Sequence, residues 1–174
     1  MSTSDKGVYV AYAHDADLGL RARLAGWRCM YMPAAVVYHH HSSTLGRFSE
    51  RRLVLVERNR AWLALKLFPP GLLLLNPFYV AVRLAASALA ALRGRGEAGS
   101  FTGARGWWPM LRALSRAWAE ALAGLPAVWR KRRQVRRSRK LSDREFLRLL
   151  RRFRISAREL AFQTIPVREA PETL

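Results

Sequence analysis

The sequence predicts an α/β segment over residues 1–60, followed by a mostly α-helical and membrane-associated part. Three observations lead to this prediction: acids and histidines among short apolar runs in the first 60 residues, a long apolar tract after them, and a net charge of +19. The 174-residue chain is 51% hydrophobic, which excludes classical disorder. Its one cysteine, Cys29, excludes an internal disulfide framework and a multi-cysteine zinc site. The N-terminus has no apolar core region, so we expect no secretory signal.

The first 60 residues are predicted to form one short helix and two short strands. Leucines at helical spacing and a closing Gly26 indicate a helix over Leu18–Gly26, with Asp17 near its cap. The runs Trp27–Met32 and Ala35–Tyr38 are rich in residues that favour strands and flank Pro33. They lead into three consecutive histidines, of which only His39 and His41 would share one side of a strand.

The carboxylates and histidines of this region are candidates for chemistry. A carboxylate near residue 15 and an imidazole about 25 residues later suit a general base and a ligand of a divalent metal. Two plainer interpretations stand beside this one. A carboxylate at a helix start is often only a cap, and histidine tracts also occur in ordinary surface loops.

Residues 61–92 are predicted to be an apolar, membrane-associated helical segment. The 21 residues from Leu72 to Leu92 contain one charge and one asparagine, a length that spans a hydrocarbon core. Arg83 falls in the middle of this window, and a charge there costs about 2.5–3.5 kcal/mol on insertion scales. Pro77 lies in its first turns. A single span and an in-plane or re-entrant arrangement therefore both remain open.

Amphipathic and basic helices are predicted over residues 107–165, after a glycine-rich flexible linker at 93–106 and before a polar tail at 166–174. In Trp107–Leu125, leucines and Trp118 form one stripe, with Arg112, Arg116 and Glu120 opposite. Such a helix lies in a membrane interface or packs on the protein's own core. Ser142 and Glu145 have the spacing of a capping box, as do Ser156 and Glu159.

The positive charge is concentrated in one stretch. Residues 128–158 carry 14 basic and 2 acidic residues, so most of the net +19 is local. A charge run of this kind is a solvated face or a surface for phosphates. Because it follows an apolar tract and a tryptophan-bearing amphipathic helix, we expect an anionic membrane surface as partner. No nucleic-acid-binding module is recognisable, so we expect no specific nucleic-acid partner.

Several motifs resemble a known enzyme family. The segment His14-Asp15-Ala16-Asp17-Leu18, the helix end Ala25-Gly26-Trp27 and the pattern Pro33-x-x-x-Val37-x-His39 occur in order, followed by Ser43-Thr44-x-Gly46 and Glu57-Arg58-Asn59. Together they resemble the C-terminal catalytic stretch of family 2 glycosyltransferases, especially the bacterial rhamnosyltransferase-like members. The resemblance is strong over residues 5–66 and loose afterwards. It implies that residues 1–60 are the last αββ part of a GT-A nucleotide-diphospho-sugar transferase fold, without the N-terminal nucleotide-binding half.

The resemblance also implies roles for individual residues. Asp15 would be the general base, His39 would contact a divalent Mg or Mn ion or the diphosphate, and Arg58 with Asn59 would line or brace the site. Asp17 would cap its helix and fix the loop that holds Asp15. His14 stands where the family usually has glutamate, which would place a titratable group beside the base.

The expected function is transfer of a sugar from a nucleotide-sugar donor to a glycan or lipid-linked acceptor, at the cytoplasmic face of the inner membrane, in cell-envelope polysaccharide synthesis. A separate chain would then supply the N-terminal half, without which this portion is expected to be inactive. The alternative is a peripheral membrane-binding module with no catalytic role, which needs only the amphipathic and basic segments.

Overall fold

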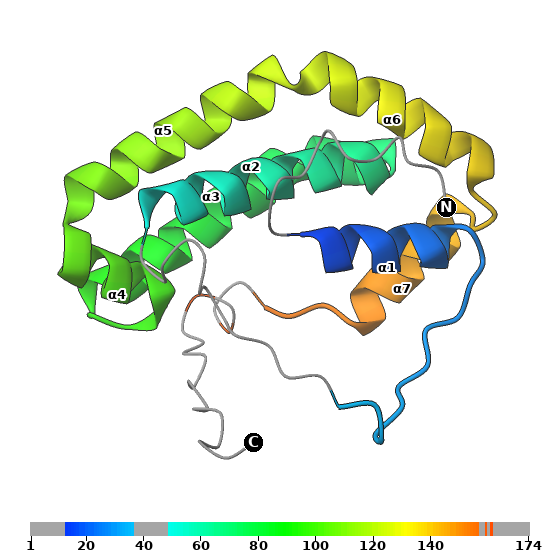
Figure 1. The fold of residues 1–174 in the computed structure, drawn as a ribbon, viewed down its shortest axis with the longest axis horizontal. Coiled ribbons are helices and arrows are strands. Elements are labelled where there is room, and N and C mark those ends of the chain that lie inside the picture. Colours follow the sequence, from blue (N-terminus) through cyan, green and yellow to red (C-terminus); the bar gives the residue numbers. More distant parts are fainter. Residues whose placement is uncertain (1–12, 37–48, 157–158, 160, 162–174) are drawn as a thin grey trace.

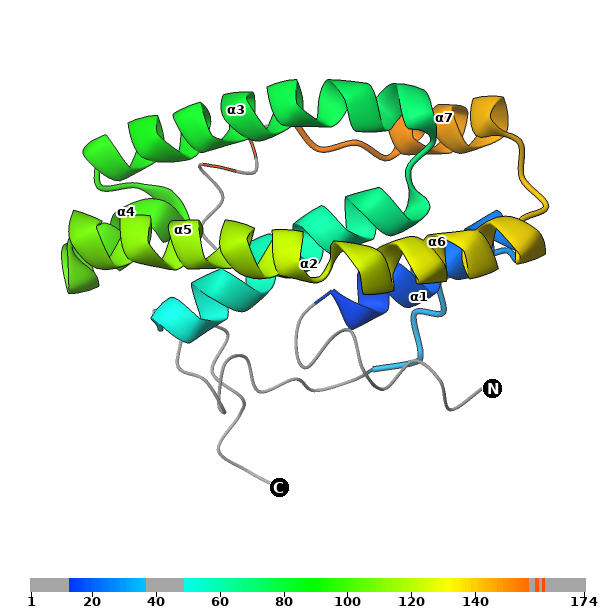
Figure 2. The same ribbon diagram turned by 90° about the horizontal axis from the view of Figure 1, so that it is seen from above.

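The protein is described here from a computed structural model, which covers residues 13–36, 49–156, 159 and 161. The described part is built from helices, and short connections join them from α2 onward (Figure 1): α1 His14–Leu24, α2 Glu50–Leu67, α3 Pro70–Leu92, α4 Gly96–Arg105, α5 Trp107–Ala123, α6 Leu125–Ser138 and α7 Asp143–Arg152. Helix α2 lies in the middle and contacts α1, α3, α5 and α6. Helices α5 and α6 arch over it, α4 closes one end, and α1 and α7 lie toward the other end (Figures 1 and 2).

The predicted α/β fold class is wrong for the part of the chain that the structure describes, because no strand forms there. Residues 27–32, expected as a strand, are irregular, and Trp27, Met30 and Tyr31 are exposed to solvent. A strand needs a neighbour to pair its backbone groups, and a run of strand-favouring residues without such a neighbour gains nothing from extension. Of the second expected strand, Ala35–Tyr38, the structure describes residues 35–36, which are also irregular, while residues 37–38 and the histidines His39–His41 that follow lie outside the described residues.

Helix α1 begins earlier than expected and ends where the sequence predicted. Gly26 has φ +89° and its N–H bonds to Arg23 O at 3.0 Å, while the Trp27 N–H bonds to Ala22 O at 3.0 Å. This pair of bonds is the usual way in which a glycine closes a helix. The start differs, since the residue before α1 is Ala13 and no side chain caps the helix. Asp17 is therefore not the cap that the sequence predicted.

Helices α2 and α3 divide the chain differently from the expected segments. Helix α2 starts at a Ser49 cap and runs without interruption across residue 60 to Leu67. Phe68 and Pro69 are extended, and Pro70 opens α3 at a first-turn position, where a proline has no hydrogen bond to lose. Pro77 lies inside α3, yet the helix continues to Leu92.

The expected linker at 93–106 contains helix α4. An added Cβ at Gly99 would lie 2.7 Å from the carbonyl carbon of Gly94, so only a glycine permits this close return of the chain after α3. The glycines that suggested flexibility in the sequence thus include one that makes a tight contact. The capping box at Ser142 and Glu145 is confirmed at the start of α7.

The apolar core consists of three small clusters around α2. Val54 packs against Ala113 and Ala117, Trp62 against Ala121 and Val128, and Leu67 against Leu24 and Phe146. The alanines of α5 face α2, and their small side chains let the two helices approach closely. A shared feature of the three clusters is that each joins α2 to a helix distant in sequence.

A buried ion pair joins α1 to α2. Lys66 Nζ donates to Asp17 Oδ2 at 3.0 Å and lies 2.9 Å from Oδ1, while Arg21 Nε reaches Oδ2 at 2.7 Å. The Lys66 and Asp17 side chains are only 2% and 4% exposed. Removing one member of such a pair leaves the other charge buried without a partner.

We expect Asp17→Asn to lower the free energy of unfolding by about 3–5 kcal/mol, the usual cost of leaving a buried charge unpaired. Urea unfolding monitored by circular dichroism measures this loss. Asp15→Asn, two residues earlier and exposed, is the matched control and should change stability little. The double change Asp17→Leu with Lys66→Met should recover much of the loss. Equal stability of Asp17→Asn and the unchanged protein would contradict the role of the pair.

A second prediction concerns the junction of α5 and α6. Trp62 Nε1 donates to Ala121 O at 3.0 Å, and its ring lies against Gly124, where an added Cβ would be 2.7 Å from Cε2. Gly124→Ala should therefore destabilise the fold by about 1–3 kcal/mol through overpacking. Gly103→Ala in α4, where a Cβ meets nothing within 4 Å, should be neutral or stabilising. Thermal unfolding of the two variants distinguishes these outcomes, and the reverse order would refute the packing argument.

Candidate membrane-binding surface

Helix α3 exposes an apolar surface along most of its length. Among the described residues it alone is long and apolar enough to cross a membrane, and none of its most apolar 18-residue stretch is buried. Leu74 is 83% exposed and Phe78 is 67% exposed, and only Ala90 and Ala91 near the end of the helix are buried. Folded soluble domains rarely leave so continuous an apolar surface uncovered.

Arg83 ties the middle of α3 to α2. Its Nη1 donates to Glu57 Oε1 at 3.1 Å, its Nη2 donates to Oε2, and Arg60 Nη1 donates to Oε1 at 3.2 Å. The Glu57 side chain is almost fully buried. The charge that interrupts the apolar tract in sequence is thus paired in a two-pronged contact, which is the strongest geometry for an arginine and a carboxylate.

A second apolar stripe runs along α5 and into α6. The large side chains that the sequence placed on one face are exposed, while the alanines take the inner positions: Leu111, Trp118, Leu122, Leu125 and Trp129 form the exposed stripe, and Ala113, Ala117 and Ala121 pack on α2. Helix α5 thus packs on the protein's own core, which was one of the two interpretations left open, but it does so through its alanines and leaves most of the leucine stripe exposed. Tryptophan on an apolar helix face is typical of a membrane interface.

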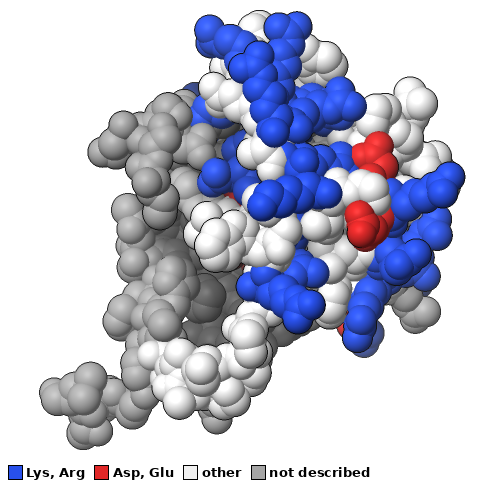
Figure 3. All heavy atoms as spheres, turned by 90° about the vertical axis from the view of Figure 1, so that its right-hand side faces the viewer, with Lys and Arg blue, Asp and Glu red and all other residues white. Residues whose placement is uncertain are grey.

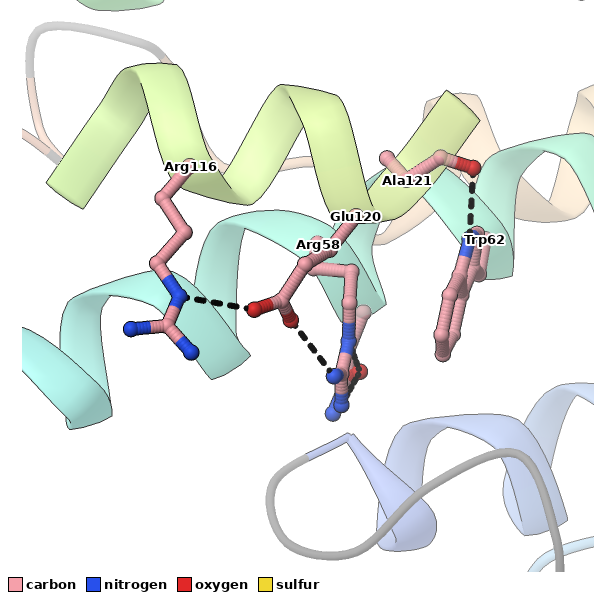
Figure 4. Close-up of polar contacts among 6 residues, drawn as sticks. Arg58, Trp62, Arg116, Glu120 and Ala121 are labelled. Carbon is pink, nitrogen blue, oxygen red and sulfur yellow. Dashed lines mark hydrogen bonds and ion pairs between the residues drawn. The ribbon is translucent and has the colours of Figure 1, made fainter. Parts of the chain in front are cut away.

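The opposite flank of α5 carries a polar cluster. Arg58 of α2 donates from Nη1 to Glu120 Oε2 at 2.9 Å, and Arg116 Nε donates to Glu120 Oε1 at 2.9 Å (Figure 4). The Arg58 guanidinium also lies 4.5 Å above the Trp62 ring and donates to Asn59 Oδ1. Figure 4 shows these side chains gathered at the seam between α2 and α5. The arginine hydrogen bonds, that of Arg116 foremost, lower the pKa of Glu120.

The segment from α6 to the end of α7 forms a strongly basic end of the molecule (Figure 3). Ten basic residues of α6, α7 and the positions next to them are exposed: Arg130, Arg133, Arg136, Arg137, Lys140, Arg144, Arg148, Arg151, Arg152 and Arg154. Arg132 differs, since it is buried and donates to Leu65 O at 2.5 Å, and desolvation lowers its pKa. We call the ten exposed residues the basic surface.

The residues predicted as a catalytic site are placed as follows. His14 and Asp15 are exposed in the first turn of α1. Asp17 is taken up by the ion pair with Lys66, and Arg58 and Asn59 contact each other in the α2–α5 seam. No group of three acidic, histidine or cysteine residues that could hold a metal ion occurs in the described ranges. His39, the predicted metal ligand, lies outside them. The role of Asp15 as a base and of His39 as a ligand stays a prediction.

Sequence reasoning missed Glu57, Lys66 and Arg83 as organising residues. Lys66 and Arg83 each interrupt an apolar run, and the sequence placed Glu57 only in the Glu57-Arg58-Asn59 motif. A charged residue within an apolar run indicates that the charge has a buried partner, because burying an unpaired charge is costly. This was the signal in the sequence that could have identified these residues. The pattern did not identify which opposite charge would reach each of them.

Comparisons with known proteins identify no relative of this chain. No family model, no curated protein and no solved structure matches this chain. The described residues also lack the strands that the glycosyltransferase resemblance required. The identification as a C-terminal portion of a family 2 glycosyltransferase is therefore wrong. The motifs match the family only over short segments of sequence, and the fold that the family requires does not accompany them.

The lowered pKa of Glu120 gives a prediction for acid. A carboxylate whose pKa is lower in the folded state than in the unfolded chain stabilises the fold above pH 4.5 and loses that effect as pH falls through the folded-state value. The free energy of unfolding of Glu120→Gln should therefore fall less between neutral pH and about pH 3 than that of the unchanged protein. Arg116→Gln, which removes the main cause of the shift, should act in the same direction. Parallel pH profiles from urea unfolding of all three proteins would show that Glu120 contributes nothing.

Proposed function

We propose that this chain is a peripheral module that binds anionic membrane surfaces. In this proposal α3 enters the apolar layer beneath the headgroups, and the basic surface contacts lipid phosphates. The observation that carries the proposal is the uncovered apolar side of α3, a helix of 23 residues, in a molecule that also exposes ten basic residues between 130 and 154. The exposed tryptophan-bearing stripe of α5 and α6 adds a second interfacial element.

The pairing of Arg83 with Glu57 favours an in-plane position of α3 over a crossing of the membrane. A crossing would carry Arg83 into the hydrocarbon core, where an unpaired charge costs about 2.5–3.5 kcal/mol. Keeping the pair would bring Glu57 along, and with it α2, which carries Arg51, Arg52, Arg58, Arg60 and Lys66. A helix with that many charges does not enter hydrocarbon. Lying in the interface lets α3 present its outer side to lipid and keep Arg83 paired.

The basic surface fits lipid phosphates better than nucleic acid. Each lysine or arginine near an anionic leaflet contributes about 1 kcal/mol of attraction, and the attraction falls off within a Debye length. Phosphates of a nucleic acid would attract the same arginines, but the uncovered apolar helix would have no partner there. A leaflet with acidic lipids, such as the cytoplasmic leaflet of a bacterial inner membrane, offers both kinds of contact.

Sugar transfer forms no part of this proposal. Asp17, Arg58 and Asn59, which the motifs offered as supporting residues of a catalytic site, have contacts that account for them as parts of the helix packing. Asp15 as a general base, and a nucleotide-sugar donor with a glycan or lipid-linked acceptor, stay predictions from the sequence.

Sedimentation with lipid vesicles tests the proposal. The protein should bind vesicles that contain phosphatidylglycerol and bind pure phosphatidylcholine vesicles weakly, and added salt should reduce the difference. The triple variant Arg133→Gln, Arg136→Gln and Arg137→Gln should weaken binding to the anionic vesicles by about a hundredfold, at about 1 kcal/mol for each charge.

The control removes the same number of charges elsewhere. Arg93 and Arg95 precede α4 and Arg105 is its last residue. Helix α4 lies at the opposite end of the molecule from the end of α6 (Figure 2), so changing these three arginines to glutamine should affect binding far less. Leu74→Gln with Phe78→Gln tests the apolar contact, because both side chains are exposed and their loss should leave the fold intact while weakening binding. Equal binding to anionic and neutral vesicles would refute the proposal.

A further inference from the structure

A large groove opens between α1, α3 and α7, with a volume of about 1520 Å³. Its walls are mainly apolar and include Leu72, Leu75 and Phe78 from α3, Leu150 from α7 and Ile155 from the segment after α7. Pockets for drug-sized ligands usually measure about 300–1,000 Å³, so this groove has room for a longer molecule.

The dimensions of the groove match an acyl chain. The part of α3 that lines it runs from Gly71 to Arg83, which is about 18 Å at 1.5 Å per residue. One leaflet of a bilayer contributes half of a hydrocarbon core of about 30 Å. A single extended chain of a membrane lipid therefore fits along this wall of the groove.

The charged residues that line the groove favour an anionic headgroup. Arg23, Arg83, Arg151 and Arg154 line the groove, and Asp143 is its only lining carboxylate among the described residues. Asp143 is paired with Arg139 at 2.5 Å and lies at the start of α7, eight residues and about 12 Å from Arg151. Neither Arg151 nor Arg154 pairs with a carboxylate in the described part of the chain, and both are exposed. Within the described residues, the apolar groove is thus lined by two guanidinium groups that no carboxylate neutralises.

We propose that this groove binds one anionic phospholipid, with an acyl chain between α1, α3 and α7 and the phosphate held by Arg151 and Arg154. The proposal rests on the proposed membrane binding and adds to it a defined lipid site, in which two residues of the basic surface, Arg151 and Arg154, hold one phosphate. A guanidinium pair with a phosphate forms charge-assisted hydrogen bonds, and arginine is suited to hold a phosphate by two prongs. The apolar walls, which are unfavourable in water, would be covered by the chain.

Gly19 offers a way to fill the groove without disturbing the fold. It lines the groove from α1, and an added Cβ there meets nothing within 4 Å. Gly19→Leu therefore places a side chain in the space of the acyl chain, and replacing a helical glycine favours the helix. Gly103→Leu is the matched control, because Gly103 is also helical with open space around it but lies in α4, outside the groove.

The experiment measures binding of a monomeric lipid to the full chain by titration calorimetry. The probe is dodecanoyl lysophosphatidic acid below its micelle concentration, compared with dodecanoyl lysophosphatidylcholine and with glycerol 3-phosphate, which has no chain. We expect the anionic lipid to bind best. Gly19→Leu and the pair Arg151→Gln with Arg154→Gln should each weaken it by about tenfold or more. Gly103→Leu and the pair Arg133→Gln with Arg137→Gln should leave it unchanged.

The outcomes separate this inference from the proposed function. Loss of vesicle binding in the α6 triple variant, with monomeric lipid binding retained, supports both. Anionic-vesicle binding with unchanged lipid affinity in Gly19→Leu overturns the groove and leaves the membrane proposal standing. Equal binding of glycerol 3-phosphate and the lysolipid would show that the chain is not held, which also overturns the groove. A Gly19→Leu protein that changes its oligomeric state in place of its lipid affinity would assign the groove to a second copy of the chain and refute the lipid.

Discussion

The side chains of α2 impose one constraint on the neighbouring helices, because Glu57 and Lys66 are buried there and each needs an opposite charge from another element. Asp17 of α1 supplies it for Lys66, and Arg83 of α3 supplies it for Glu57, together with Arg60. The three apolar clusters around α2 are small and separate. Apolar packing of that size is not specific about direction, whereas a buried charge tolerates only a position that pairs it. The ion pairs therefore fix where α1 and α3 dock.

This arrangement leaves large apolar side chains outside. Alanines occupy the inner positions of α5, so Trp118 and Leu122 face outward, and α3 is held through Arg83 and through α4 while most of its apolar side chains stay uncovered. In a water-soluble bundle the larger side chains would be expected inside. If lipid covers these surfaces, the placement of small side chains inside and large apolar ones outside has a physical reason. The hydrocarbon of the lipid then covers the large side chains in place of a protein core. Because few large apolar side chains are buried, the stability of the fold depends more on its polar contacts than on its buried apolar area.

Charge and apolar surface are divided between two parts of the molecule, and the groove lies where they meet. The basic surface follows α6 and α7, and the groove is walled by α3 on one side and by α1 and α7 on the other. A membrane surface would contact the first part through many weak, salt-sensitive attractions. A single lipid in the groove would instead be held by shape and by two arginines. Arg151 and Arg154 belong to both, but Gly19 lines the groove without being part of the basic surface, and Arg133 and Arg137 belong to the basic surface without lining the groove, so substitutions at these positions can separate the two modes.

The sequence alone determined the helical periodicity of the second half of the chain, the capping box at Ser142, the glycine end of α1 at Gly26 and the concentration of charge after residue 128, because these depend on local spacing and composition. It did not determine that residues 27–32 stay irregular, since a strand depends on a partner far away in the chain. It also assigned chemistry to Asp17, Arg58 and Asn59 from short motifs, whereas their contacts with Lys66, Glu120 and one another are visible only in three dimensions. Which apolar face of α5 is buried was likewise decided by the tertiary structure, because α2 accepts the small alanines and excludes the larger leucines and tryptophan.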